Sequence, residues 1–211
     1  MKKYPFALVN IAQAALFLGA LGIALPSALA AMTEPYASYT VKPSDTLQGL
    51  SRSLLNEPSR WGEVAKLNGL KNPNLIYPGQ VIDIPKSLLN FNSQPRIAVL
   101  GTLLNVQGDV TINGQKVQAG APVPEGARVQ TSSDSSAIVR LGDGSRLRLM
   151  PKTLADVVTQ HGYALRDPAS SASTTWFSGA IRLVEGVLDT LAEKKANRTA
   201  PLTVTTPTSV V

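Results

Sequence analysis

Between residues 39 and 85 the apolar pattern changes period twice, and this limits what the segment can fold into. Residues 39–41 alternate as a strand does, and residues 81–84 do so again. Between them, leucines recur at helical spacing over 47–55, and a second apolar helical face begins at Trp61. The pattern predicts an α+β module in the order strand, helix, helix, strand.

Polar residues are suitably placed to begin and end the two helices. Asp45 is predicted to cap the first helix, because its carboxylate accepts from the free N–H groups of the first turn, with Gln48 completing a capping box. Ser59 is a good N-cap for the second helix, and Glu63 lies near the positive end of its dipole. The Asn-Gly pair at 68–69 is expected to end it.

The segment 39–85 resembles the LysM family in residue type and spacing along its whole length. The motifs that carry the resemblance are Tyr39-x-Val41, Ser44-Asp45-Thr46-Leu47, Trp61, Asn68, Pro73, Ile76, Pro78-Gly79-Gln80 and Ile84-Pro85. Ser44 departs from the family pattern, which usually has glycine before the Asp-Thr-Leu run. A Cβ at this position is expected to narrow the binding loop or to force a different turn.

The resemblance implies a non-catalytic module that binds N-acetylglucosamine-containing glycans, either peptidoglycan or a chitin-like polymer. It implies a shallow groove between the loop after the first strand and the loop before the last. The residues carried over to this groove are Ser44, Asp45, Thr46, Leu47, Pro73, Asn74, Leu75 and Ile76. Backbone groups would pair with the acetamido group and hydroxyls, while Leu47, Pro73 and Ile76 would contact the sugar faces.

The groove residues also have structural explanations, which the sequence leaves open. Asp45 can be only a helix cap, Leu47 and Ile76 only core, and Pro73 only a turn former. Trp61 suits a sugar platform, but its helical core position favours packing.

Residues 86–99 are predicted to be a linker, and residues 100–211 an all-β region. Within it, the Asn-Gly pair at 113–114 predicts a two-residue hairpin turn, with strands at 110–112 and 115–117.

A second hairpin is predicted around the loop 142–144, with Gly144 in the left-handed conformation. Side-chain parity favours this three-residue loop, because it pairs Val139 with Leu147 and Arg140 with Arg146. Arg140, Arg146 and Arg148 would then share one face. They form a candidate patch for an acidic partner, although a solvated sheet face explains them as well.

The region 100–211 resembles a FecR-type domain. The positions that carry this resemblance are Gly101, Gly108-Asp109-Val110, Gly126–Thr131, Ala137-x-Val139-x-Leu141-x-Asp143-Gly144-Ser145, Leu183-x-x-Gly186 and Val204-x-Thr206-Pro207. In that family a Val-Arg-Gly-Thr element follows the Thr-Pro pair, so the domain is expected to be incomplete at Val211. The signal relay of the best-known FecR proteins, through a membrane helix, does not transfer to this chain, which leaves a periplasmic β module with either a carbohydrate or an envelope protein as its ligand. The Ser-rich stretch 167–175 is interpreted as a mobile insertion.

The first thirty residues have the pattern of an export signal. Lys2 and Lys3 give a positive start, residues 6–25 are mostly Ala and Leu, and Ala28-Leu29-Ala30 forms a small-x-small cleavage site. We expect a mature chain beginning near Ala31, in the periplasm or at the cell wall, without a stable membrane span. An uncleaved N-terminal anchor is the alternative.

Composition argues against several functions. The chain has no cysteine, which excludes disulfides, thiolate metal sites and cysteine nucleophiles. The sole histidine, His161, lacks a metal-binding motif and is interpreted as a loop residue, so no catalytic residue, metal or cofactor is predicted. Few aromatics and the lack of a long Lys/Arg run make nucleic acid a poor candidate partner.

These patterns predict a binding protein that anchors a FecR-like β domain at peptidoglycan. Two alternatives remain open at this stage. One is a periplasmic sensor or regulatory component that signals to a membrane partner, and the other is an accessory subunit of a wall hydrolase.

Overall fold

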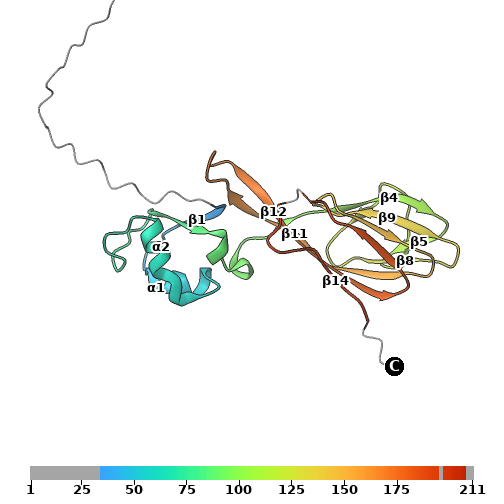
Figure 1. Ribbon diagram of the computed structural model, residues 1–211, viewed down its shortest axis with the longest axis horizontal. Helices are drawn as coiled ribbons and strands as arrows, with labels where there is room; N and C mark the ends of the chain where they lie inside the picture. The colour runs from blue at the N-terminus through green and yellow to red at the C-terminus, as the bar shows by residue number, and fades with distance from the viewer. Residues whose placement is uncertain (1–33, 195–196, 208–211) are drawn as a thin grey trace, which may run out of the picture.

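The computed structural model describes residues 34–194 and 197–207. They form a small α/β unit and a larger β unit, which a long hairpin connects (Figure 1). The predicted signal peptide and its cleavage site lie outside the described residues.

The small unit has the predicted order of strand, helix, helix and strand. Its strands β1 and β2 pair antiparallel, with Tyr39 opposite Ile82. β1 starts three residues earlier than the alternation indicated. The elements are β1 (Tyr36–Thr40), α1 (Leu47–Leu54), the 3₁₀ helix η1 (Pro58–Arg60), α2 (Trp61–Leu67) and β2 (Val81–Pro85).

The predicted cap of α1 is wrong by one residue. Thr46, not Asp45, is the N-cap, and its side chain accepts a hydrogen bond from the Gly49 N–H at 3.1 Å. The carboxylate of Asp45 is already engaged in the preceding turn, where it accepts from the Lys42 N–H at 2.7 Å and from the Tyr39 hydroxyl at 3.0 Å. A capping box with Gln48 therefore does not form.

The predicted start of α2 is also wrong. Ser59 lies inside η1, a 3₁₀ turn opened by Pro58, and α2 follows at Trp61 without a side-chain cap. Proline favours the first position of a helical turn because its φ angle is already fixed there. Glu63 occupies the first turn of α2 as predicted, and the predicted end at Asn68 and Gly69 is confirmed.

The segment 86–99, expected to be a linker, contributes to the core of the small unit. Leu88 and Leu89 are 1% and 2% exposed and pack in the same apolar cluster as Val41 and Ile84. Its elements are η2 (Lys86–Leu88), η3 (Phe91–Ser93) and β3 (Ile97–Ala98).

The β unit consists of two sheets that enclose one apolar core. In the larger sheet the order is β14-β12-β11-β8-β5-β6, and in the smaller it is β13-β10-β9-β4-β7. Leu103, Leu147 and Ile181, at most 2% exposed, belong to this core. The strands are β4 (Gly101–Gln107), β5 (Val110–Ile112), β6 (Gln115–Lys116), β7 (Pro122–Val123), β8 (Arg128–Thr131), β9 (Ser136–Arg140), β10 (Arg146–Leu149), β11 (Leu154–Arg166), β12 (Ser173–Glu185), β13 (Leu188–Leu191) and β14 (Thr203–Thr205).

Both predicted hairpins are confirmed. Asn113 and Gly114 connect β5 to β6, with φ angles of 52° and 79°. In the second hairpin, Val139 pairs with Leu147 and Arg140 with Arg146, and Gly144 has a φ angle of 90°.

The β11–β12 hairpin reaches from the β unit to the small unit (Figure 1). Arg166 near its tip pairs with Tyr36 of β1, so β1 and β2 join the larger sheet of the β unit. Leu165 is 1% exposed within the core of the small unit, and Trp176 packs against the same core. The two units therefore share both a sheet and a core.

The stretch 167–175 is not an insertion into the sheet, because residues 167–172 form the turn of this hairpin and residues 173–175 begin β12. β12 begins at Ser173, and Asp167 Oδ1 accepts hydrogen bonds from the N–H groups of Ala169 and Ser170 at 2.9 and 3.0 Å. Serine suits such a turn because its hydroxyl also pairs with nearby backbone groups.

Candidate functional site

The first candidate loop follows β1 and turns at Ser44. Ser44 has a φ angle of 72°, so the turn that glycine would make is retained with a side chain in the left-handed region. The carboxylate of Asp45 closes the turn through Lys42 N–H and Tyr39 Oη. Partial burial, together with the bond to Asp45, raises the pKa of the Tyr39 hydroxyl. The loop is thus held in one conformation by its own side chains.

Replacing Ser44 with glycine is expected to stabilise the protein. A residue with a Cβ in the left-handed region costs roughly 1 kcal/mol, and glycine removes that strain. Glycine also increases the conformational entropy of the unfolded chain, which offsets part of the gain. We expect Ser44→Gly to raise the free energy of unfolding by about 0.5 kcal/mol, measured by urea denaturation. A lower value for Ser44→Gly than for the parent would contradict the interpretation of strain at this turn.

The second candidate loop lies before β2 and is attached to the first by backbone hydrogen bonds. Val41 N–H donates to Gln80 O, and Gly79 N–H donates to Val41 O, both at 2.8 Å. Within the loop, Leu75 N–H donates to Asn72 O at 3.0 Å. These bonds fix the bases of the two loops against each other.

The structure places the eight predicted groove residues in three groups. The side chain of Leu47 is only 4% exposed and belongs to the core, which supports its structural explanation, and Ile76 packs against the same core. Asp45 and Pro73 are half-buried. The exposed members are Ser44, Thr46, Asn74 and Leu75. A ligand in this groove would thus meet the backbone and these four side chains.

Sequence reasoning did not select Tyr77, whose ring is 58% exposed in the same loop, two residues beyond Leu75. Leu75 itself is 51% exposed. Exposed apolar and aromatic side chains suit the apolar face of a sugar ring. The signal that could have identified Tyr77 is its place immediately before the Pro78-Gly79 turn, where a side chain has little core to pack against.

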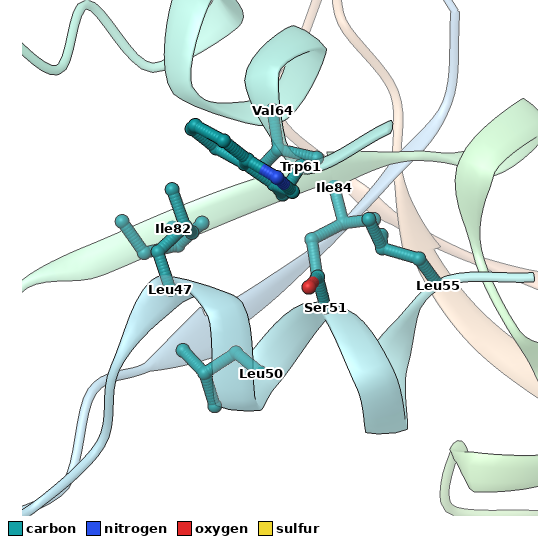
Figure 2. A pocket seen from close by; sticks show the side chains of 8 residues that line it. All are labelled: Leu47, Leu50, Ser51, Leu55, Trp61, Val64, Ile82 and Ile84. Carbon is teal, nitrogen blue, oxygen red and sulfur yellow. The ribbon is translucent and has the colours of Figure 1, made fainter. Parts of the chain in front are cut away.

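An apolar pocket lies between α1, α2 and β2 of the small unit. Figure 2 shows Trp61 of α2 above Leu47 of α1, with Ile82 of β2 next to Leu47 and Ile84 nearer to Leu55. Trp61 is 38% exposed, so the prediction that it packs is only partly correct. Leu47 is the sole predicted groove residue among those that line the pocket.

In the β unit, Asp156 of β11 binds two arginines at once. Its carboxylate accepts from Arg128 at 2.7 and 3.1 Å and from Arg182 at 2.6 and 3.2 Å. The bond to Arg128, followed by that to Arg182, lowers the pKa of Asp156 to about 2 against the opposing effect of burial.

This lowered pKa makes part of the stability dependent on pH. The folded-state pKa lies below the ordinary value of about 3.9, so the contribution is complete above about pH 4 and is lost as the pH falls towards 2. Asp156→Asn is expected to lower the free energy of unfolding at pH 7 by on the order of 1–2 kcal/mol. The difference in this free energy between the parent and the variant should become smaller towards pH 2. Urea denaturation at several pH values tests this, and a difference constant from pH 7 to 2 would contradict it.

The interpretation of His161 as a loop residue is wrong. It is 8% exposed in the middle of β11, with Nδ1 at 2.5 Å from Glu125 Oε2 and Nε2 at 2.9 Å from the Tyr163 hydroxyl. Burial raises the pKa of Glu125, but the N–H of Gln160 and the His161 ring outweigh it, and the pKa is lowered. These contacts account for His161 as a buried hydrogen-bonding residue.

The predicted arginine face of the second hairpin is confirmed as a shared, exposed face. Arg140 and Arg146 are cross-strand partners, and Arg148 stands opposite Asp189 of β13. Within residues 34–194 and 197–207, no cluster of three His, Asp or Glu side chains could hold a metal ion. In the same ranges no helix has the length and apolarity needed to cross a membrane.

Comparison with known proteins identifies the small unit. The LysM domain family matches residues 39–85, so this segment is a LysM domain, a class of non-catalytic module that binds peptidoglycan and related glycans. This match covers residues 39–85 and does not show a FecR-type domain in the rest of the chain. No solved structure matches the chain.

Two curated relatives match a short stretch of the chain. The potassium binding protein Kbp of Escherichia coli O6:H1 is 40% identical over 50 residues, which is 23% of this chain and 34% of that protein. An uncharacterized protein of Deinococcus radiodurans is 38% identical over 47 residues, 22% of this chain and 19% of that protein. The chain thus spans about a third or less of the length of each relative.

Proposed function

We propose that this chain is a non-catalytic peptidoglycan-binding protein of the bacterial envelope, whose LysM domain holds the β unit at the cell wall. The observation that carries the proposal is the LysM domain at residues 39–85, with both of its candidate loops fixed by hydrogen bonds. The export signal predicted at residues 1–30 supports a location in the periplasm or at the wall.

The two loops suit an uncharged sugar polymer. Recognition of an acetamido group and hydroxyls needs backbone donors and acceptors rather than charged side chains. Ser44, Thr46 and Asn74 add exposed polar groups, and Leu75 adds an exposed apolar one. Because the loops are already ordered by the bonds of Asp45 and Val41, little conformational entropy is lost on binding.

The β unit is the part that the LysM domain would localise. Its sequence resembles a FecR-type domain, and its partner in this proposal is a protein or carbohydrate of the envelope. A second candidate function is a sensor, in which the β unit passes a signal to a membrane partner. The sheet shared by β1 and β11 favours this candidate, because a ligand on one unit would act on a structure continuous with the other.

A nuclear magnetic resonance titration with a soluble N-acetylglucosamine tetramer tests the binding function. The amide signals of residues 44–47 and 74–76 are expected to shift together with one dissociation constant. A control titration with a glucose oligomer of equal length should leave them in place, because glucose lacks the acetamido group. Shifts confined to the β unit, or none at millimolar sugar, would contradict the proposed function.

A further inference from the structure

A row of polar side chains crosses the exposed face of the larger sheet in the β unit. Strand register places Asp156 of β11 directly between Arg128 of β8 and Arg182 of β12. Thr205 of β14 stands beside Arg182, and Asn113 is hydrogen-bonded to the backbone of Arg128 at 2.8 Å. These five residues are called the arginine row.

The row presents two oriented guanidinium groups. The hydrogen bonds to Asp156 use Nε and Nη2 of each arginine. The arginine side chains remain 53% and 58% exposed, whereas that of Asp156 is 11% exposed. Asp156 therefore holds both guanidinium groups in place while other N–H donors of each stay accessible to a ligand. Such orientation in advance reduces the entropy lost when an anion binds.

Hollows flank the row on both sides and have mixed linings. One lies over Asn113, Gly126 and Val158, next to both arginines. The other is lined by both arginines together with Leu183, Val184, Thr205, Thr206 and Pro207. A ligand seated on the arginines would thus have apolar surface and hydroxyl groups within reach, as an extended peptide with small side chains requires.

We propose that the arginine row binds a carboxylate of the short stem peptides attached to peptidoglycan strands. The inference rests on the proposed wall-binding function, because the LysM domain brings this ligand close to the β unit. Two guanidinium groups and one carboxylate give the row a net charge of +1, which one peptide carboxylate neutralises. A phosphate dianion carries two negative charges, more than the single positive charge of the row. A guanidinium group can also form two parallel hydrogen bonds with a carboxylate.

The test uses the full chain and a free stem pentapeptide, which carries no sugar, so its outcome is independent of glycan binding by the LysM loops. The Nε–H signals of Arg128 and Arg182 are expected to shift on titration at low ionic strength. The triple variant R128Q/D156N/R182Q removes the row without leaving a buried charge, and should weaken binding at least tenfold. A thermal unfolding curve establishes that this variant is folded.

Arg52→Gln is the matched control, because it changes the net charge by the same amount at an exposed position of α1 in the LysM domain. It should bind the peptide within twofold of the parent. A pentapeptide with every carboxylate converted to a carboxamide should not bind. Equal binding by the triple variant, equal binding of the carboxamide peptide, or tighter binding of inorganic phosphate than of the peptide would overturn the proposal.

Discussion

Leu165→Ala is expected to destabilise the LysM domain, although Leu165 lies about 80 residues beyond it in the chain. The side chain is 1% exposed and packs in the core that contains Leu47 and Ile82. A buried leucine truncated to alanine costs roughly 2–5 kcal/mol, because the lost contacts leave a cavity. We expect a loss of about 3 kcal/mol in the free energy of unfolding.

Tryptophan fluorescence during urea denaturation measures this effect, because Trp61 lines the pocket of the LysM domain and Trp176 packs on its core. Leu191→Ala is the control, since that leucine is 68% exposed on β13 and should change the midpoint little. An unchanged midpoint for Leu165→Ala would mean that the hairpin adds nothing to the LysM core, and that the units are independent.

Arg198→Ala is expected to cost about 3 kcal/mol in the β unit. Its guanidinium donates to Asp143 Oδ2 at 2.6 and 2.8 Å and to Ser145 Oγ at 2.7 Å. The side chain of Asp143 is 1% exposed and that of Arg198 16%. Removing one partner of a buried ion pair leaves the other charge without compensation, which costs about 3–5 kcal/mol. Differential scanning calorimetry of the parent and the variant measures the loss.

The double variant D143N/R198A separates charge from packing. If the unpaired carboxylate causes the loss, the neutral amide that replaces it in the double variant should restore part of the stability that Arg198→Ala removes. A double variant as unstable as Arg198→Ala, or less stable, would show that the arginine stem contributes through packing instead.

Local signals in the sequence were sufficient for the turns. Asn113-Gly114 and Gly144 adopt the positive φ angles that their hairpins need, and side-chain parity gave the register of Val139 with Leu147. The order of elements in the LysM domain also follows from local periodicity. In each case the interactions that decide the conformation lie within a few residues.

Features that depend on more distant partners are not predictable in the same way. Asp45 fails as a cap because Tyr39 and Lys42 compete for its carboxylate. The pattern around His161 does not indicate a strand, because β11 has a register shift between Val157 and Thr159 and does not alternate regularly. No periodicity could indicate that Leu165 fills the core of the LysM domain.

The candidate groove was predictable as two loops but less so as a set of side chains. The spacing of the LysM motifs located both loops, whereas only the packing shows that Leu47 faces the core and Leu75 faces solvent. Exposure of this kind depends on tertiary packing, which the sequence pattern does not encode directly.

Co-sedimentation with insoluble peptidoglycan tests the central claim most directly. The chain without residues 1–30 should sediment with the polymer, and Leu75→Asp should lose at least tenfold in affinity, because a charge replaces an exposed apolar contact in the groove. Leu100→Asp, at a leucine 59% exposed outside the LysM domain, should bind as the parent does. The predicted result is that the parent and Leu100→Asp bind the wall polymer and that a folded Leu75→Asp does not. No sedimentation of the parent above a bead control would contradict the account.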